Sequence, residues 1–146
     1  MSSKKLIAKL VYCGLVLLLA LGICSPRGVA GQILSGVYKV TETTDLGPQM
    51  RVTLQIRLTN AGEERIFVTQ TRLRGLLHAG RSEDRPVRVI LDPHGGAEFT
   101  QDFIVAKQEY GLWSKGVRPH LGLRMQIAGG QETTITLELM RLPGSR

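Results

Sequence analysis

The chain has 146 residues, of which 19 are basic and 12 acidic, so its formal net charge is +7 at pH 7. Four basic residues and no acidic ones fall in residues 1–30, which leaves 15 basic against 12 acidic residues, a net charge of +3, in residues 31–146. This small surplus does not favour a nucleic-acid partner. Both cysteines, Cys13 and Cys24, also lie before residue 31, so we expect one ordinary domain without a disulfide or a thiolate site.

Residues 1–30 have the pattern of a secretory signal peptide. Three lysines stand among the first nine residues, an apolar run covers residues 10–23, and the small residues Gly28 and Ala30 occupy the positions that signal peptidase recognises. The pattern predicts a signal-peptide helix and cleavage after Ala30. We therefore expect a secreted or periplasmic product that meets the membrane only through this leader, before cleavage.

Two alternatives for the leader remain open. It could stay uncleaved as a membrane anchor, although its apolar run is shorter than the ~20 residues of a membrane span. It could also be lipidated at Cys24, although Ile23 stands where bacterial lipoprotein signals carry a small residue.

The most regular stretch of the remaining chain begins at Arg51. Apolar and polar side chains alternate there up to Thr59, which is the pattern of a strand with one buried face. Asn60-Ala61-Gly62 ends this strand, and a second strand is predicted over residues 65–73. We expect the two strands to pair as a hairpin, with Ile66 and Val68 facing inward. The four aliphatic residues of the first strand are Val52, Leu54, Ile56 and Leu58.

The same alternation recurs along the rest of the chain, with turn residues between the stretches and no convincing helical period. Short strands at this spacing predict an all-β fold, a seven-stranded antiparallel Ig-like sandwich over residues 31–142, with residues 143–146 as a frayed tail. An eight-stranded barrel around a ligand is the alternative. The seven predicted strands cover residues 37–42, 51–59, 65–73, 87–91, 99–105, 121–127 and 133–142.

The strand that ends in Leu58-Thr59-Asn60-Ala61-Gly62 and is followed by another strand resembles bacterial exported Ig-like and fibronectin III-like modules. In those families the first hairpin often closes on an Asn-x-Gly turn. Leu91-Asp92-Pro93-His94-Gly95-Gly96, before an aromatic-bearing strand, resembles their midpoint turn. The resemblance implies a β-sandwich, but the disulfide of antibody domains is missing and Trp113 falls in a predicted loop, so the subfamily stays open.

No motif predicts catalysis or a bound metal. No Gly-x-Ser-x-Gly surrounds a serine after residue 30, and the only imidazoles are His78, His94 and His120. Asp92 and His94 are typical of a turn, whereas His120 and Met125 are five residues apart and should face opposite sides of a strand. We expect no enzyme activity, no cofactor and no metal, and keep an enzyme as the least favoured alternative.

The predicted loop over residues 107–118 is the first candidate binding surface. Tyr110 and Trp113 supply rigid aromatic contact area, and Lys115 and Arg118 supply charge. The alternative is that Trp113 folds back and plugs one end of the sandwich.

A flat polar sheet face is the second candidate surface, although any solvated sheet would show the same pattern. We therefore expect an exported, non-catalytic interaction module whose partner is a cell-envelope protein or a glycan, with small-ligand or carbohydrate binding as the alternative. The expected face carries Thr53, Gln55, Arg57, Arg124, Gln126, Thr134, Thr136 and Glu138.

Overall fold

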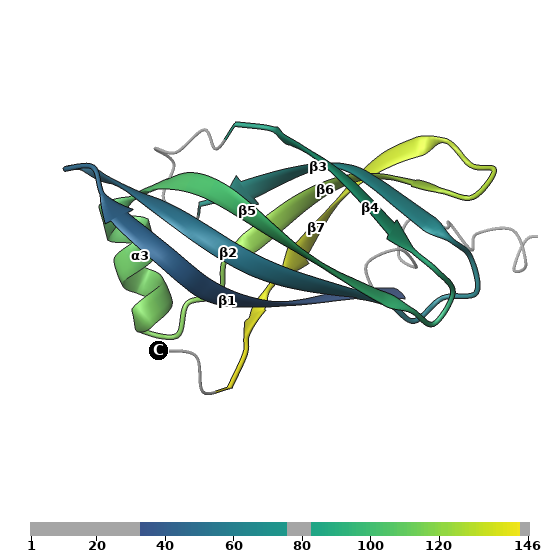
Figure 1. The fold of residues 1–146 in the computed structure, drawn as a ribbon, viewed down its shortest axis with the longest axis horizontal. Coiled ribbons are helices and arrows are strands. Elements are labelled where there is room, and N and C mark those ends of the chain that lie inside the picture. The colour runs from purple at the N-terminus through teal and green to yellow at the C-terminus, as the bar shows by residue number, and fades with distance from the viewer. Residues whose placement is uncertain (1–32, 76–82, 144–146) are drawn as a thin grey trace, which may run out of the picture.

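A computed structural model of the chain describes residues 33–75 and 83–143 (Figure 1). The expected signal peptide, its cleavage site, both cysteines and His78 lie outside these residues. The described part contains one short helix, and every other regular element is a strand. The elements are β1 (Leu34–Asp45), β2 (Gln49–Asn60), β3 (Ile66–Arg74), β4 (Arg85–Leu91), β5 (Gly96–Ala106), α3 (Lys107–Ser114), β6 (His120–Ile127), β7 (Glu132–Glu138) and β8 (Met140–Arg141).

The strands form two four-stranded sheets packed face to face. Sheet A has the order β5-β2-β1-β8, and sheet B has the order β4-β3-β6-β7. Neighbouring strands are antiparallel except β8, whose two residues pair in parallel with β1. The predicted all-β sandwich is thus confirmed at the level of architecture.

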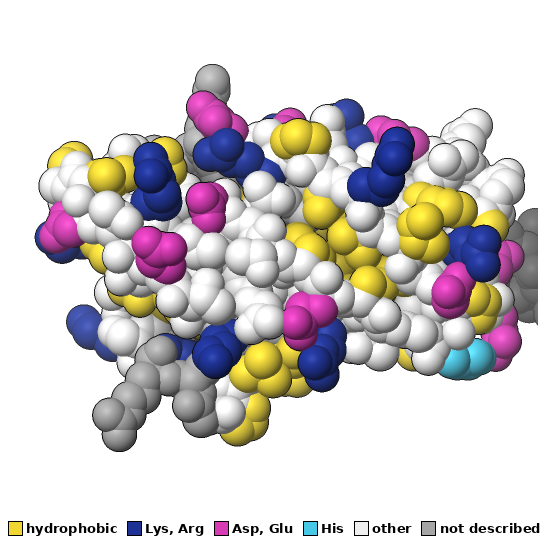
Figure 2. Space-filling model, in the orientation of Figure 1, with side chains coloured by type: hydrophobic (Ala, Val, Ile, Leu, Met, Phe, Trp, Pro, Cys, Tyr) yellow, Lys and Arg dark blue, Asp and Glu magenta, His cyan; other side chains and the backbone are white. Residues whose placement is uncertain are grey.

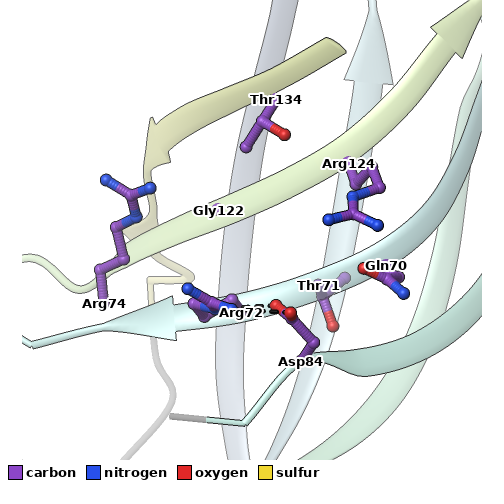
Figure 3. A pocket seen from close by; sticks show the side chains of 8 residues that line it. All are labelled: Gln70, Thr71, Arg72, Arg74, Asp84, Gly122, Arg124 and Thr134. Atoms are coloured by element: carbon purple, nitrogen blue, oxygen red, sulfur yellow. Dashed lines mark hydrogen bonds and ion pairs between the residues drawn. The ribbon is translucent and has the colours of Figure 1, made fainter. Parts of the chain in front are cut away.

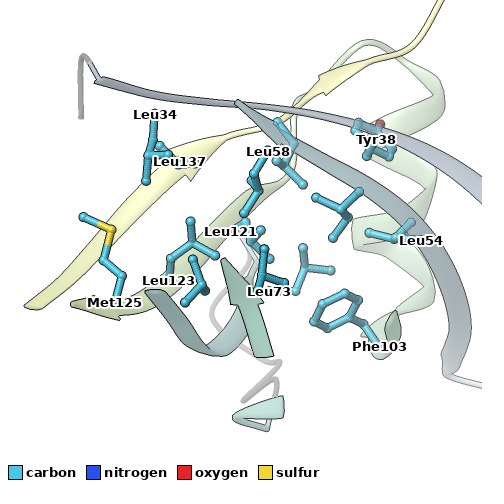
Figure 4. Close-up of a cluster of buried hydrophobic side chains, with 14 of the residues drawn as sticks. Leu34, Tyr38, Leu54, Leu58, Leu73, Phe103, Leu121, Leu123, Met125 and Leu137 are labelled. Atoms are coloured by element: carbon cyan, nitrogen blue, oxygen red, sulfur yellow. The ribbon is translucent and has the colours of Figure 1, made fainter. Parts of the chain in front are cut away.

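The core lies between the two sheets (Figure 4). The four alternating aliphatic side chains of β2 are all 0% exposed, because period two directs them to the same face of sheet A. Leu121, Leu123 and Met125 of β6, all 0% exposed, meet them from sheet B. Ile66 and Val68 of β3 are buried too, as the sequence predicted.

The predicted hairpin between β2 and β3 is wrong. The two strands lie in different sheets, since β2 pairs with β1 and β5 whereas β3 pairs with β4 and β6. The segment after Asn60 therefore crosses from one sheet to the other. Alternation shows which side chains are buried, but it does not show which strand lies alongside.

The side chain of Asn60 stabilises this crossing through hydrogen bonds. Its side chain is 0% exposed, and its amide group donates hydrogen bonds to the carbonyl oxygens of Glu64 (2.8 Å) and Asp92 (3.1 Å). Its Oδ1 atom accepts one from the N–H of Gly62 (2.9 Å). Because Asp92 belongs to the connection from β4 to β5, Asn60 ties both crossings at this end of the sandwich.

The end of the chain also differs from the prediction of one strand over residues 133–142. The strand is interrupted at Leu139, which is 0% exposed and whose N–H donates to the carbonyl of Pro119 (2.9 Å). The chain then passes from sheet B to sheet A, so the described part has an eighth, two-residue strand. A Cβ atom at Gly36 of β1 would lie 2.6 Å from Leu139 Cδ2, so β1 carries glycine where the crossing chain packs.

Candidate functional site

Residues 107–118, predicted as a loop, contain the helix α3. Two of its residues are buried, Glu109 and Trp113, which lie four apart on one helical face. The Trp113 ring is 4% exposed and packs edge-on against Tyr38 (ring centroids 6.2 Å apart, 72°) and Tyr110 (5.6 Å, 67°). Burial raises the pKa of the Tyr38 hydroxyl. Trp113 therefore occupies the position of a plug, the alternative that the sequence left open.

The basic residues of this segment lie on the surface. Lys115 is exposed at the C-terminal end of α3, and the Arg118 side chain is 54% exposed in an ion pair with Glu138 (3.2 Å). The four candidate residues thus do not form one aromatic and basic surface, because Trp113 points inward while the two charges point outward.

The single polar face expected from the sequence is divided between opposite sides of the sandwich. Thr53, Gln55 and Arg57 belong to β2 in sheet A, whereas the other five members belong to β6 and β7 in sheet B. On sheet A the polar groups bond to one another: Thr53 to Asp102 (2.8 Å), and Gln55 (2.6 Å) and Arg57 (3.2 Å) to Glu98. In Figure 2, acidic and basic side chains are interspersed among uncharged ones over β1, β2 and β5. Arg51, an exposed residue of the same face, has no hydrogen-bond or ion-pair partner among the described residues.

The outer face of sheet B contains a hollow of about 130 Å³, which we call the arginine groove (Figure 3). A bulge in β3 between Val68 and Gln70 changes the alternation, so that Arg72 and Arg74 point outward while Leu73 stays buried. Gly122 of β6 lies opposite Arg72 and leaves the floor free of a side chain. The groove is lined by Gln70, Thr71, Arg72, Arg74, Asp84, Gly122, Arg124 and Thr134.

The three guanidinium groups of the groove are engaged to different degrees. Arg72 binds Asp84 with two hydrogen bonds of 2.7 Å, which lower the pKa of the Asp84 carboxyl and raise that of Arg72. Arg124 forms an ion pair with Glu132 (Nε to Oε1, 3.3 Å), and its positive charge also contributes to the lowered pKa of the Asp84 carboxyl. Arg74 has no hydrogen-bond or ion-pair partner among the described residues.

Arg74 also lies close to the floor of the groove. Its Nε would be 3.5 Å from a Cβ atom at Gly122, and in Figure 3 Arg74 and Arg124 stand on either side of Gly122. The Oε1 atom of Gln70, another lining residue, is buried without a partner in the part of the chain that the structure describes. The groove therefore combines free cationic donors with an unused acceptor. The free donors suit a ligand that bears negative charge, whereas the Gln70 oxygen would need a hydrogen-bond donor from that ligand.

A second hollow of about 310 Å³ lies at the end of the sandwich where β1 begins. Its wall is mainly apolar, and the nearby Glu63 carboxylate contacts Nε2 of His94 (2.9 Å). The residues lining the hollow are Ile33, Gly62, Glu63, Glu64, Ile66, Met125 and Ile127.

No group of three or more His, Cys, Asp or Glu side chains that could hold a metal ion occurs among residues 33–75 and 83–143. Nor does any helix there have the length and apolar character to cross a membrane.

Comparisons with known proteins add little. No family model matches the chain, and no curated protein matches it in sequence. The X-ray structure of the structural genomics target SoR45 is similar to 76% of this chain over 86% of its own length, with 10% identity and a TM-score of 0.42. A protein from Archaeoglobus fulgidus matches 70% of this chain over 89% of its own length, with 10% identity and a TM-score of 0.34. Similarity this low supports no inference about the present chain.

Proposed function

We propose that the chain is an exported, Ig-like binding domain without catalytic activity, acting in the bacterial periplasm or at the cell surface. The Ig-like assignment is supported by the strand order. β2 lies between β1 and β5 in one sheet, and β3 and β6 are adjacent in the other, as in Ig-like sandwiches whose fourth strand has joined the second sheet. The export assignment rests on the leader pattern of residues 1–30.

The observation that carries the binding role is the difference between the two outer sheet faces. On sheet A, Thr53, Gln55 and Arg57 bond to acidic neighbours, whereas the arginine groove on sheet B gathers three guanidinium groups in one hollow and keeps Arg74 without a partner in the described residues. Unpaired guanidinium groups in a hollow are typical of recognition sites for anionic groups. The partner is a protein of the cell envelope or a glycan, and neither a nucleic acid nor a cofactor is required.

Affinity capture tests this role. The purified full chain is immobilised and exposed to bacterial envelope extract and, separately, to a glycan array. We expect one protein or glycan to be retained by the wild type and by Arg51→Gln, which removes a charge from the outer face of sheet A, and to be lost with Arg74→Gln. Retention that is equal in all three proteins would contradict a binding role for the groove.

The hollow near Ile127 supports the alternative, a small-ligand domain, because its volume and mainly apolar wall fall in the range of ligand pockets. A screen of small apolar compounds by nuclear magnetic resonance separates the two functions. Shifts of the Ile66 and Ile127 methyl groups, with no change at Arg74, would favour a small ligand over a macromolecular partner.

A further inference from the structure

We infer that the arginine groove binds the carboxylate of an acidic, extended segment of a partner protein. This inference rests on the proposed binding function and names the ligand class for the same site. The groove already contains one carboxylate of the chain itself, since Asp84 accepts two hydrogen bonds of 2.7 Å from Arg72. The arginines of the groove are therefore positioned to bind a planar carboxylate through two N–H donors of one guanidinium group.

Donors remain for a second carboxylate. A guanidinium group has five N–H donors, and the one ion-pair partner of Arg124 among the described residues is Glu132 (Nε to Oε1, 3.3 Å). Arg74 uses none of its donors on any described residue. Because Gly122 between them has no side chain, an acid group can approach the sheet closely from outside. The place for the incoming acid is thus above Gly122, between Arg74 and Arg124.

The lining favours a peptide over a sugar. None of the eight lining residues is aromatic, so the groove has no flat apolar surface on which a sugar ring could stack. Thr134 lines the groove from β7, and β7 is an edge strand that pairs only with β6 among the described strands. An extended segment can add to this edge through backbone hydrogen bonds and direct every second side chain to the face that holds the groove.

The opposite edge of sheet B is less suited to strand addition. β4 contains Pro86, which has no N–H, and its ladder with β3 is broken by the bulge. β7 has no proline, and its ladder with β6 runs without a register shift from His120 to Gln126. Thr134 of this accessible edge strand lines the groove, whose other lining residues belong to β3, to β6 and to the segment before β4.

The test titrates isotopically labelled full chain with a hexapeptide of alternating threonine and glutamate. The comparison probes are the matching threonine–glutamine hexapeptide, hexagalacturonate and inorganic phosphate. We expect the acidic peptide to shift the Arg74 side-chain signal and the backbone signals of β7, and to bind at least tenfold more tightly than the glutamine peptide. Arg74→Gln should weaken its binding about tenfold, Arg74→Lys by less, and Arg51→Gln not at all.

Equal affinity for the two peptides would overturn the inference, and so would tighter groove binding by hexagalacturonate or phosphate than by the acidic peptide. Unfolding midpoints of the variants, measured in parallel, distinguish a lost contact from a lost fold. The two proposals can fail separately: Arg74-dependent capture of an envelope partner without binding of the acidic peptide would retain the binding function and reject this ligand class.

Discussion

At the scale of a single residue, Trp113 attaches α3 to the end of the sandwich. Its ring touches Tyr38 of β1 and Tyr110 of its own helix, and its Nε1 is buried without a partner among the described residues. The indole therefore stabilises the fold through buried area and edge-on ring contacts. A side chain with these contacts is not available to a partner unless the helix detaches.

Trp113→Ala should accordingly lower the free energy of unfolding by about 3–5 kcal/mol, the usual loss for a large aromatic residue removed from a core. Urea unfolding followed by circular dichroism measures the change. Lys115→Ala, at the exposed end of the same helix, is the matched control and should change stability by no more than about 0.5 kcal/mol. A Trp113→Ala protein as stable as the wild type would show that the ring is not a plug.

At the scale of elements, local patterns predicted the strands well and their partners poorly. Each of the seven alternating stretches appears as a strand, because period two follows from which face is buried. The crossing after Asn60 and the switch of sheets at Leu139 depend on contacts distant in sequence. The sequence therefore predicted the sandwich, but it paired β2 with the wrong neighbour and merged β7 with β8.

The candidate site was predictable only in part, for a similar reason. Alternation predicts Arg124 and Thr134 on a polar sheet face, but it assigns Arg72 and Arg74 to no candidate surface. Their spacing of two residues was the available signal, since it places both on one face of a strand. The bulge before them decides that this face is outward, but no sequence pattern predicts the bulge. No sequence pattern predicts that Asp84 lies beside Arg72 either.

The sequence predicts a loop over residues 107–118, since Gly111 and Gly116 interrupt this segment, whereas the structure has the helix α3 there. Gly111 nevertheless has open space around its Cβ position, and no conformational demand requires glycine there. Gly116, by contrast, has φ +91° just after the helix, where glycine is favoured. The two glycines thus have opposite roles in the same segment.

Gly111→Ala should therefore raise the free energy of unfolding by about 0.5–1 kcal/mol, because alanine loses less backbone entropy in a helix. Gly116→Ala is the matched control and should lower it by about 1 kcal/mol, because alanine is strained at positive φ. Thermal and urea unfolding of both variants give the comparison. Destabilisation by Gly111→Ala would mean that residue 111 is not helical in solution.

At the scale of the whole molecule, exposed ion pairs link distant parts of the chain. Lys107 at the start of α3 pairs with Asp45 at the end of β1, and Arg72 of β3 pairs with Asp84 before β4. Hydrogen bonds from Lys107 and Arg72 are the main reason why the pKa values of the two carboxyls are lowered. Because both pairs are solvent-exposed, each contributes modestly to stability.

These lowered pKa values predict how stability changes in acid. An unfolded aspartate has a pKa of about 3.9, and the folded values of Asp45 and Asp84 lie below their ordinary value. The pairs therefore stabilise the fold fully above about pH 4, and this contribution is lost as the pH falls through the folded pKa values. The combined Asp45→Asn and Asp84→Asn variant should have a lower urea midpoint than the wild type at pH 7, and the gap should narrow as the pH falls below about 4. Glu42→Gln, which removes one exposed carboxylate from β1 and leaves both pairs intact, shows the effect of losing a single unpaired negative charge. A gap that persisted undiminished as the pH fell would assign the loss to packing at the substituted positions.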